Sequence, residues 1–199
     1  MHELVAAGSS LIRIDYRSFE LADSDSGPMG EYRPTNGLIF SRPGLATVLT
    51  GVSSGPVSGR VEVYRSPVPL AETEDWDEVV DHTVESVSGD MKVSSVLGDV
   101  PDLPVLTPSG AGVYRVRVHA RGRDLKPDGV TFEPVEDYLI QVWPQPRLPD
   151  TVHRQTDRRG AIARASAAAA APTLARPQQP VSPAELAMRR HMEHRRKNR

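Results

Sequence analysis

Residues 112–121 read GVYRVRVHAR, with apolar and basic side chains in strict alternation. A period of two is typical of a β-strand that has one face toward a core and the other toward solvent. We therefore predict that Tyr114, Val116 and Val118 are buried, and that the arginines between them form a basic outer face.

Strand-like patterns continue on both sides of this segment. Residues 137–143, DYLIQVW, are apolar on both faces, which is typical of a strand in the interior of a sheet. Upstream, Ile12, Ile14 and Tyr16 alternate with polar residues. The apolar residues then move from even to odd positions, beginning at Phe19. This shift predicts a β-bulge near residues 17–18.

Turn signals separate the predicted strands. Residues 84–88 and 91–96 flank Gly89-Asp90, which predicts a β-hairpin with a tight turn. About eight short strands with turns every 8–12 residues are typical of an all-β protein. The expected architecture is an antiparallel two-sheet sandwich, either jelly-roll-like or a partly open barrel.

The charge distribution divides the chain. Residues 1–146 hold 12 Lys and Arg against 22 Asp and Glu, a balance of −10, whereas residues 147–199 hold 12 against 4, a balance of +8. We predict a β-sandwich domain over 1–146 and a disordered Pro/Ala/Arg linker over 147–181. Ser182-Pro183-Ala184-Glu185 forms a capping box, which predicts a short basic helix over 182–199.

The basic C-terminal segment is a candidate for nucleic-acid binding, because cations that neutralise phosphates release counterions. It lacks interleaved aromatic residues, so any such binding would not read sequence. Two alternatives stay open: the cations favour a helix C-terminus, or the tail lies on its own acidic body. The candidate residues are Arg189, Arg190, Arg195, Arg196, Lys197 and Arg199.

An acidic run is the main charged feature of the body. One interpretation is a solvated loop that Trp76 anchors, and the other is a surface that imitates a polyanion and docks on a basic partner cleft. The run lacks the glycine-containing, alternating pattern of a calcium loop. The candidate protein-binding residues are Glu72, Glu74, Asp75, Asp77, Glu78 and Asp81.

Motifs for catalysis are missing from the sequence. There is no G-x-S-x-G, no Walker loop, no H-E-x-x-H and no cysteine, so we expect a non-enzyme without cofactor or metal. His191 and His194 alone make a poor metal site. The first 15 residues lack a basic leader with an apolar run, and no stretch is apolar enough for a membrane span. We expect a cytoplasmic location.

Two regions together resemble a known family. The first is Trp76-Asp77-Glu78-Val79-Val80 followed by Val87-Ser88-Gly89; the second combines residues 112–118, Arg123-Asp124 and residues 136–144. Over residues 10–146 the chain is similar to the competence protein J group, small β-sandwich proteins associated with inhibiting a competence nuclease, and to uncharacterised actinobacterial relatives. It departs from the group at residues 126–129, KPDG, which replace an acidic, glycine-rich approach to the last strand.

The resemblance implies a protein-binding inhibitor or immunity-type protein without catalysis. Our first hypothesis is therefore a module that engages a nuclease or toxin through the acidic run. The alternative is a nucleic-acid-associated accessory protein tethered by residues 182–199, whose binding would be lost without them and would weaken steeply with salt. An enzyme would require a pocket with converging polar groups, which the sequence does not indicate.

Overall fold

The structure is a computed structural model that describes residues 3–24, 26, 33–71 and 73–170. Contacts within the chain group Met1–Ala169 into one compact unit and Ala170–Arg199 into a second. The described elements are β1 (Leu4–Ile14), β2 (Ser18–Ala22), β3 (Ile39–Arg42), β4 (Leu45–Leu49), β5 (Gly55–Tyr64), β6 (Glu78–Ser86), β7 (Lys92–Ser95), β8 (Gly112–Arg121), β9 (Asp137–Pro144), β10 (Thr151–Gln155) and α1 (Arg158–Ala169).

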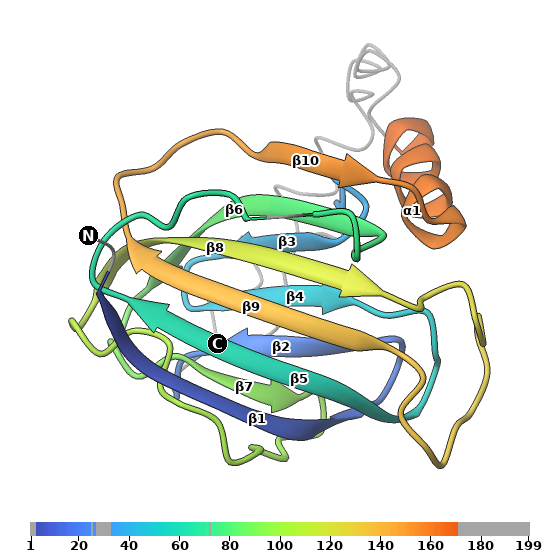
Figure 1. The fold of residues 1–199 in the computed structure, drawn as a ribbon, viewed down its shortest axis with the longest axis horizontal. Helices are drawn as coiled ribbons and strands as arrows, with labels where there is room; N and C mark the ends of the chain where they lie inside the picture. The colour runs from blue at the N-terminus through green and yellow to red at the C-terminus, as the bar shows by residue number, and fades with distance from the viewer. Residues whose placement is uncertain (1–2, 25, 27–32, 72, 171–199) are drawn as a thin grey trace, which may run out of the picture. The chain divides into compact units, whose positions relative to one another are not determined.

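The strands form two sheets (Figure 1). A six-stranded sheet has the order β1-β5-β9-β8-β6-β10, and a four-stranded sheet has the order β3-β4-β2-β7. All neighbours pair antiparallel except β5 and β9, which are parallel. The expected purely antiparallel arrangement is therefore corrected at this pair. The prediction that residues 137–143 lie in a sheet interior is confirmed, because β9 lies between β5 and β8.

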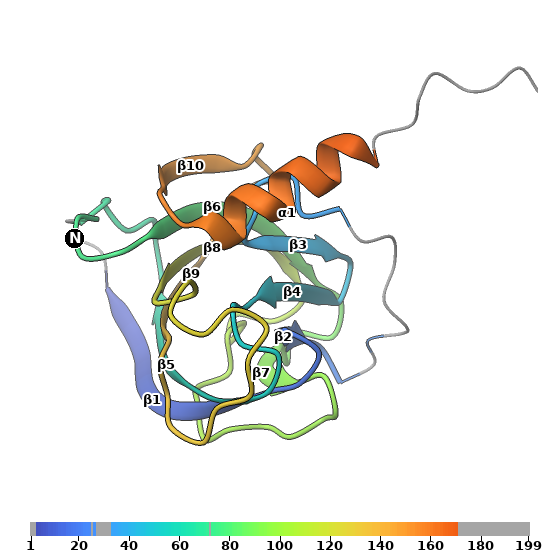
Figure 2. The same cartoon turned by 90° about the vertical axis from the view of Figure 1, so that its right-hand side faces the viewer.

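One hydrophobic core fills the space between the two sheets (Figure 2). Alternation gives β8 an inward apolar face, on which Tyr114, Val116 and Val118 are all buried. Phe19 of the four-stranded sheet meets Tyr138 of the six-stranded sheet edge-on, with ring centroids 5.2 Å apart and an interplanar angle of 83°. This contact joins the sheets near the ends of β2 and β9.

Two tight turns carry the chain from one sheet to the other. Residues 16–17 connect β1 to β2, and the predicted bulge near residues 17–18 is in fact this turn, closed by a 3.3 Å hydrogen bond from Ser18 N to Asp15 O. The predicted hairpin at Gly89-Asp90 is also wrong, because β6 and β7 belong to different sheets. Turn chemistry indicates where the chain reverses, but the pairing partner depends on the packing of the whole body.

The C-terminal segment corrects the expectation of a linker over 147–181. β10 pairs with the edge of β6, and α1 places Ala163 against Phe40 and Leu49 of the four-stranded sheet. The guanidinium of Arg123 binds the carboxylate of Asp157 in a fully buried pair, with distances of 2.6 and 2.9 Å. Backbone pairing, small side chains and ion pairs dock this segment, so it needs few large apolar residues. Residues 171–181 and the predicted helix over 182–199 lie outside the described residues.

Candidate functional site

The structure divides the predicted acidic surface into exposed and buried parts. Glu74 and Asp75 are exposed, and Glu72 lies outside the described residues. Asp77 is half-buried, and its carboxylate accepts a 2.8 Å hydrogen bond from the amide of Gly122. Asp77 therefore fixes the start of β6 against the end of β8, which leaves two freely presented carboxylates.

Glu78 is completely buried beneath the C-terminal segment. Its carboxylate lies 3.1 Å from a guanidinium nitrogen of Arg164 on α1. Burial and the neighbouring carboxylate of Asp157 raise the pKa of Glu78 to about 7, against the opposing charges of Arg123 and Arg164. This carboxyl group belongs to the interface between β6 and α1.

Asp81 is also buried, within a charge cluster on the outer side of the six-stranded sheet. It accepts hydrogen bonds of 2.6 and 3.1 Å from Arg117, and its carboxylate lies 3.2 Å from Nε2 of His153. Burial acts to raise the pKa of Asp81, but the hydrogen bonds and charge of Arg117 outweigh it and hold the pKa below the usual range. Glu78 and Asp81 cannot reach a docking partner in this structure, which corrects the expectation of one continuous six-carboxylate surface.

The predicted basic face of β8 is covered as well. The segment that contains Val68 and Pro69 lies over the outer side of the six-stranded sheet, where their carbonyls accept 3.2 and 3.1 Å hydrogen bonds from Arg117. Trp76 packs on the ring of His119 with centroids 5.2 Å apart, and burial lowers the pKa of that imidazole to about 4. Arg121 remains exposed at the end of the strand, so a basic binding stripe along β8 does not form.

A different surface stands out at the end of the body where β1 turns into β2. Within the described chain, three non-glycine residues have positive φ, and all three lie here: Tyr16 at 55°, Arg17 at 64° and Asp128 at 60°. Two consecutive positive φ values define a primed turn, which Asn-Gly normally occupies. A side chain in this left-handed region costs about 1–2 kcal/mol per residue. Tyr16 and Arg17 are therefore strained, and each carries a large side chain.

A rigid frame holds the strained turn. The amide of Arg17 donates to the carbonyl of Ser53 at 3.2 Å, and the guanidinium of Arg17 pairs with Asp128 at 2.9 Å. Behind them the buried carboxylate of Glu136 accepts the amides of Gly51 and Val52 at 3.1 and 2.6 Å. Gly51 must be glycine, since a Cβ would lie 1.9 Å from the carbonyl oxygen of Arg123.

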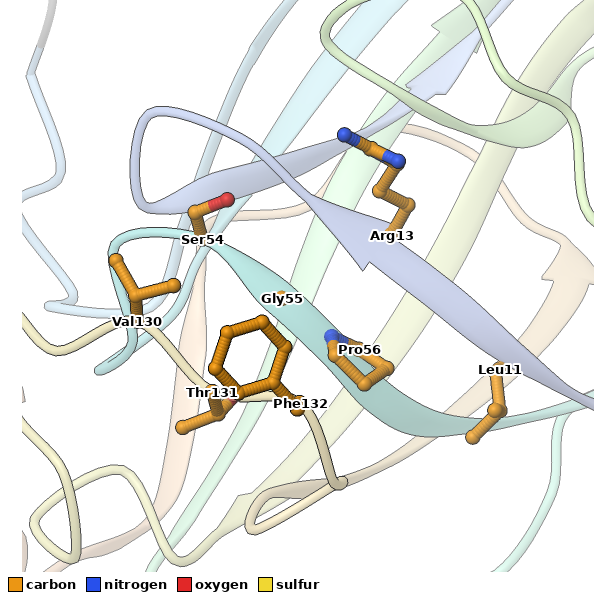
Figure 3. Close-up of a pocket in the computed structure, with 8 residues that line it drawn as sticks. All are labelled: Leu11, Arg13, Ser54, Gly55, Pro56, Val130, Thr131 and Phe132. Atoms are coloured by element: carbon orange, nitrogen blue, oxygen red, sulfur yellow. The ribbon is translucent and has the colours of Figure 1, made fainter.

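Exposed apolar side chains surround the turn. We call Leu11, Tyr16, Arg17, Val130 and Phe132 the turn-end surface; its two aromatic members, Tyr16 and Phe132, are 76% and 91% exposed. Figure 3 shows Phe132 and Val130 on one side of a depression of about 420 Å³, with Leu11 of β1 on the other. Further depressions open on both sides of Tyr16 and Arg17. Loosely held loops do not sustain such an arrangement, so this end is a pre-formed, partly apolar face.

Other predicted sites cannot be located in the described part of the chain. The six basic residues between 189 and 199 lie outside it, so their role in nucleic-acid binding stays a prediction. Among the described residues, no group of three or more His, Asp or Glu side chains is arranged to hold a metal ion. In the same residues, no helix combines the length and apolarity of a membrane span.

The two sheets and the core between them define a mostly-β protein, and the turn-end surface is its candidate site. No family model and no curated protein matches the sequence. Among solved structures, the fold is similar to that of ComJ from Bacillus subtilis, an inhibitor of the DNA degrading activity of NucA. The two sequences are 12% identical, the match covers 73% of this chain and 99% of ComJ, and the TM-score is 0.49. The product of crocagin biosynthetic gene J is similar at 13% identity, 71% and 100% coverage and a TM-score of 0.44.

Sequence reasoning missed the turn-end surface because its residues are far apart in the chain. The sequence pattern predicts a strand at Tyr16 and a bulge near Arg17, and it makes no prediction for Phe132. A local signal does exist: the parity shift between Tyr16 and Phe19, without glycine or asparagine between them, marks a reversal made by unsuitable residues. The proximity of Phe132 to Leu11 and Pro56 has no local signal.

Proposed function

We propose that this chain is a non-catalytic protein-binding module of the inhibitor or immunity type, and that it docks through the turn-end surface. The observation that carries the proposal is the coincidence of backbone strain at Tyr16 and Arg17 with the exposed aromatic side chains of Tyr16 and Phe132. The proposal replaces the acidic run as the principal interface, because two of its carboxylates are buried in ion pairs.

Strain of this kind supports a functional role. Asn-Gly would relax a turn with two positive φ values, so Tyr16 and Arg17 reduce stability through backbone strain. The exposed ion pair between Arg17 and Asp128, worth about 0–1 kcal/mol, offsets only part of that cost. Tyr16 is largely exposed and therefore gains little from packing inside the body. Residues that lower stability yet project into solvent are expected where binding requires them.

The composition of the surface suits protein recognition. Tyrosine, phenylalanine and arginine are enriched at protein interfaces, and hot spots favour aromatic and arginine side chains. The frame around Glu136 fixes the surface before a partner arrives, which lowers the entropy lost on binding. The depressions beside Phe132 and Tyr16 could receive side chains of a partner.

The sequence resemblance implies a nuclease or toxin as partner. The balance of −10 over residues 1–146 supports a basic partner, since complementary charge accelerates encounter. In this arrangement the exposed Glu74 and Asp75 add to the negative charge that speeds encounter with the partner. The anchoring energy comes from the aromatic residues.

The proposal is tested by capturing partners from nuclease-treated host lysate on the immobilised full-length chain. We expect a stoichiometric protein to be retained by the wild type and lost with Phe132→Ser, with affinity for the purified partner falling about 30-fold or more. Val87→Ser serves as the matched control. Val87 is 61% exposed and follows the last residue of β6, at the end of the body opposite to the turn-end surface. The purified partner is then assayed for DNA cleavage with and without the chain.

Three results would contradict the proposal. Equal capture by Phe132→Ser and the wild type removes the turn-end surface from the interface. Loss of capture in Glu74→Gln/Asp75→Asn alone returns the interface to the acidic run. Capture that occurs from untreated lysate and disappears on nuclease treatment would instead favour the accessory protein tethered to nucleic acid by residues 182–199.

A further inference from the structure

One depression of the turn-end surface combines an apolar floor with two guanidinium groups. It has a volume of about 340 Å³ and lies between the β1–β2 turn and the start of α1. Phe40 and Leu49 form its floor and are both nearly buried, while Tyr16, Arg17 and Arg159 stand around it. We call it the arginine pocket.

The charges in the arginine pocket do not balance. Arg17 and Arg159 approach the same carboxylate oxygen of Asp128, at 2.9 and 3.4 Å. Within the described chain, Asp128 is the single carboxylate in contact with either guanidinium. Each guanidinium has five N–H donors, so one shared oxygen leaves donors for a further acceptor. The side chains of Arg17, Arg159 and Asp128 therefore sum to a charge of +1, in a body that is otherwise acidic.

We propose that the arginine pocket binds one carboxylate carried on an aromatic or branched apolar group, as an acidic side chain beside an apolar one on the partner would present it. This inference rests on the proposed protein-binding function and names the chemistry of the contact. The carboxylate pairs with Arg17 and Arg159, and the apolar group lies on Phe40 and Leu49. A single net positive charge matches a monoanion.

The docked C-terminal segment completes the pocket. Arg159 is held in place because Asp157 accepts the amide of Gly160 at 2.6 Å, while Asp124 accepts the amides of Arg158 and Arg159 at 2.8 and 3.1 Å. These carboxylates cap the first turn of α1, so its amides are already occupied. The anion must therefore be held by the guanidinium side chains.

Sodium benzoate is the probe, titrated into the full-length chain at low salt while NMR follows the Nε–H signals of Arg17 and Arg159. We expect saturable shifts at both signals, and binding of the neutral isostere benzamide about tenfold weaker or more. Arg159→Gln should reduce benzoate affinity about tenfold. Arg158→Gln is the matched control, because its exposed neighbouring side chain does not line the pocket and benzoate affinity should stay near wild type.

Absent or non-saturable shifts, equal binding of benzamide, or an equal loss in Arg158→Gln would overturn the inference. Failure of the benzoate titration is distinguishable from failure of the proposed function, since partner capture is measured separately with Phe132→Ser. Capture that depends on Phe132 while benzoate does not bind leaves the protein-binding face intact and removes the carboxylate contact. Circular dichroism and the melting temperature of Arg159→Gln confirm that the variant is folded.

Discussion

The acidic run and the turn-end surface are two regions of one end of the body with opposite relations to the sequence. The acidic run is contiguous and easily seen in the sequence, yet Glu78 and Asp81 are buried in internal ion pairs with Arg164 and Arg117. The turn-end surface combines residues more than a hundred positions apart, yet it presents Tyr16 and Phe132 to solvent on a rigid frame. Charge density along a chain is therefore a poor guide to which charges remain available to a partner.

The largest expected difference between the two regions is in stability. Asp81→Ala should lower the free energy of unfolding by about 3–5 kcal/mol, because it leaves Arg117 buried without its anion. Asp75→Ala should change it by less than about 0.5 kcal/mol, since Asp75 is exposed. Urea denaturation measures both, and equal costs would show that Asp81 is not part of the interior.

Relaxing the strained turn should separate stability from binding. Replacing Tyr16 and Arg17 together, Tyr16→Asn with Arg17→Gly, should raise the free energy of unfolding by about 1–2 kcal/mol, because Asn-Gly suits a primed turn. The same variant should lose partner capture. Tyr16→Phe keeps both the ring and the strain, so its stability should match the wild type. A destabilised Asn-Gly variant would contradict the assignment of strain.

The buried carboxyl of Glu78 predicts a pH dependence of stability. Its pKa is raised from 4.5 to about 7 in the folded protein, so its contribution is complete below the unfolded value and is lost as pH rises through 7. Glu78→Gln should remove this decline, which we expect to be of the order of 1 kcal/mol. The measured quantity is the difference between the unfolding free energies of variant and wild type at pH 5, 6, 7 and 8. His119, whose pKa is lowered, titrates in both proteins and cancels in that difference. A difference that is flat with pH would show that Glu78 stays ionised.

The smallest effect is expected at the exposed carboxylates. Glu74→Gln/Asp75→Asn should leave the free energy of unfolding within about 0.5 kcal/mol of wild type. Partner affinity at physiological salt should change little, with a slower association rate at low salt, because rim charges act mainly on encounter. Surface plasmon resonance at two salt concentrations tests this, and a large rise in the dissociation rate would move the anchor of the interface to these residues.

Much of the strand content could be predicted from local pattern, and the pairing could not. Residues 137–143 are apolar on both faces, which correctly indicated an interior strand, because burial of both faces requires apolar residues on each of them. Gly89-Asp90 correctly marked a chain reversal, but the two strands beside it do not pair with each other. A turn can send the next strand into another sheet, as happens between β6 and β7. β10 and α1 escaped prediction because Arg, Ala and Gly dock through ion pairs and close backbone contact, which hydrophobic periodicity does not register.

The sequence alone determined the alternation of the strands, the position of the reversals and the segregation of charge between the two parts of the chain. Each of these depends on residues within a few positions of one another. The tertiary structure decided which carboxylates were neutralised, which arginines were covered and which aromatic residues met at the turn end. Those outcomes depend on contacts between residues such as Arg17 and Asp128, or Glu78 and Arg164. Their separation along the chain hides these contacts until the two sheets and the C-terminal segment are packed together.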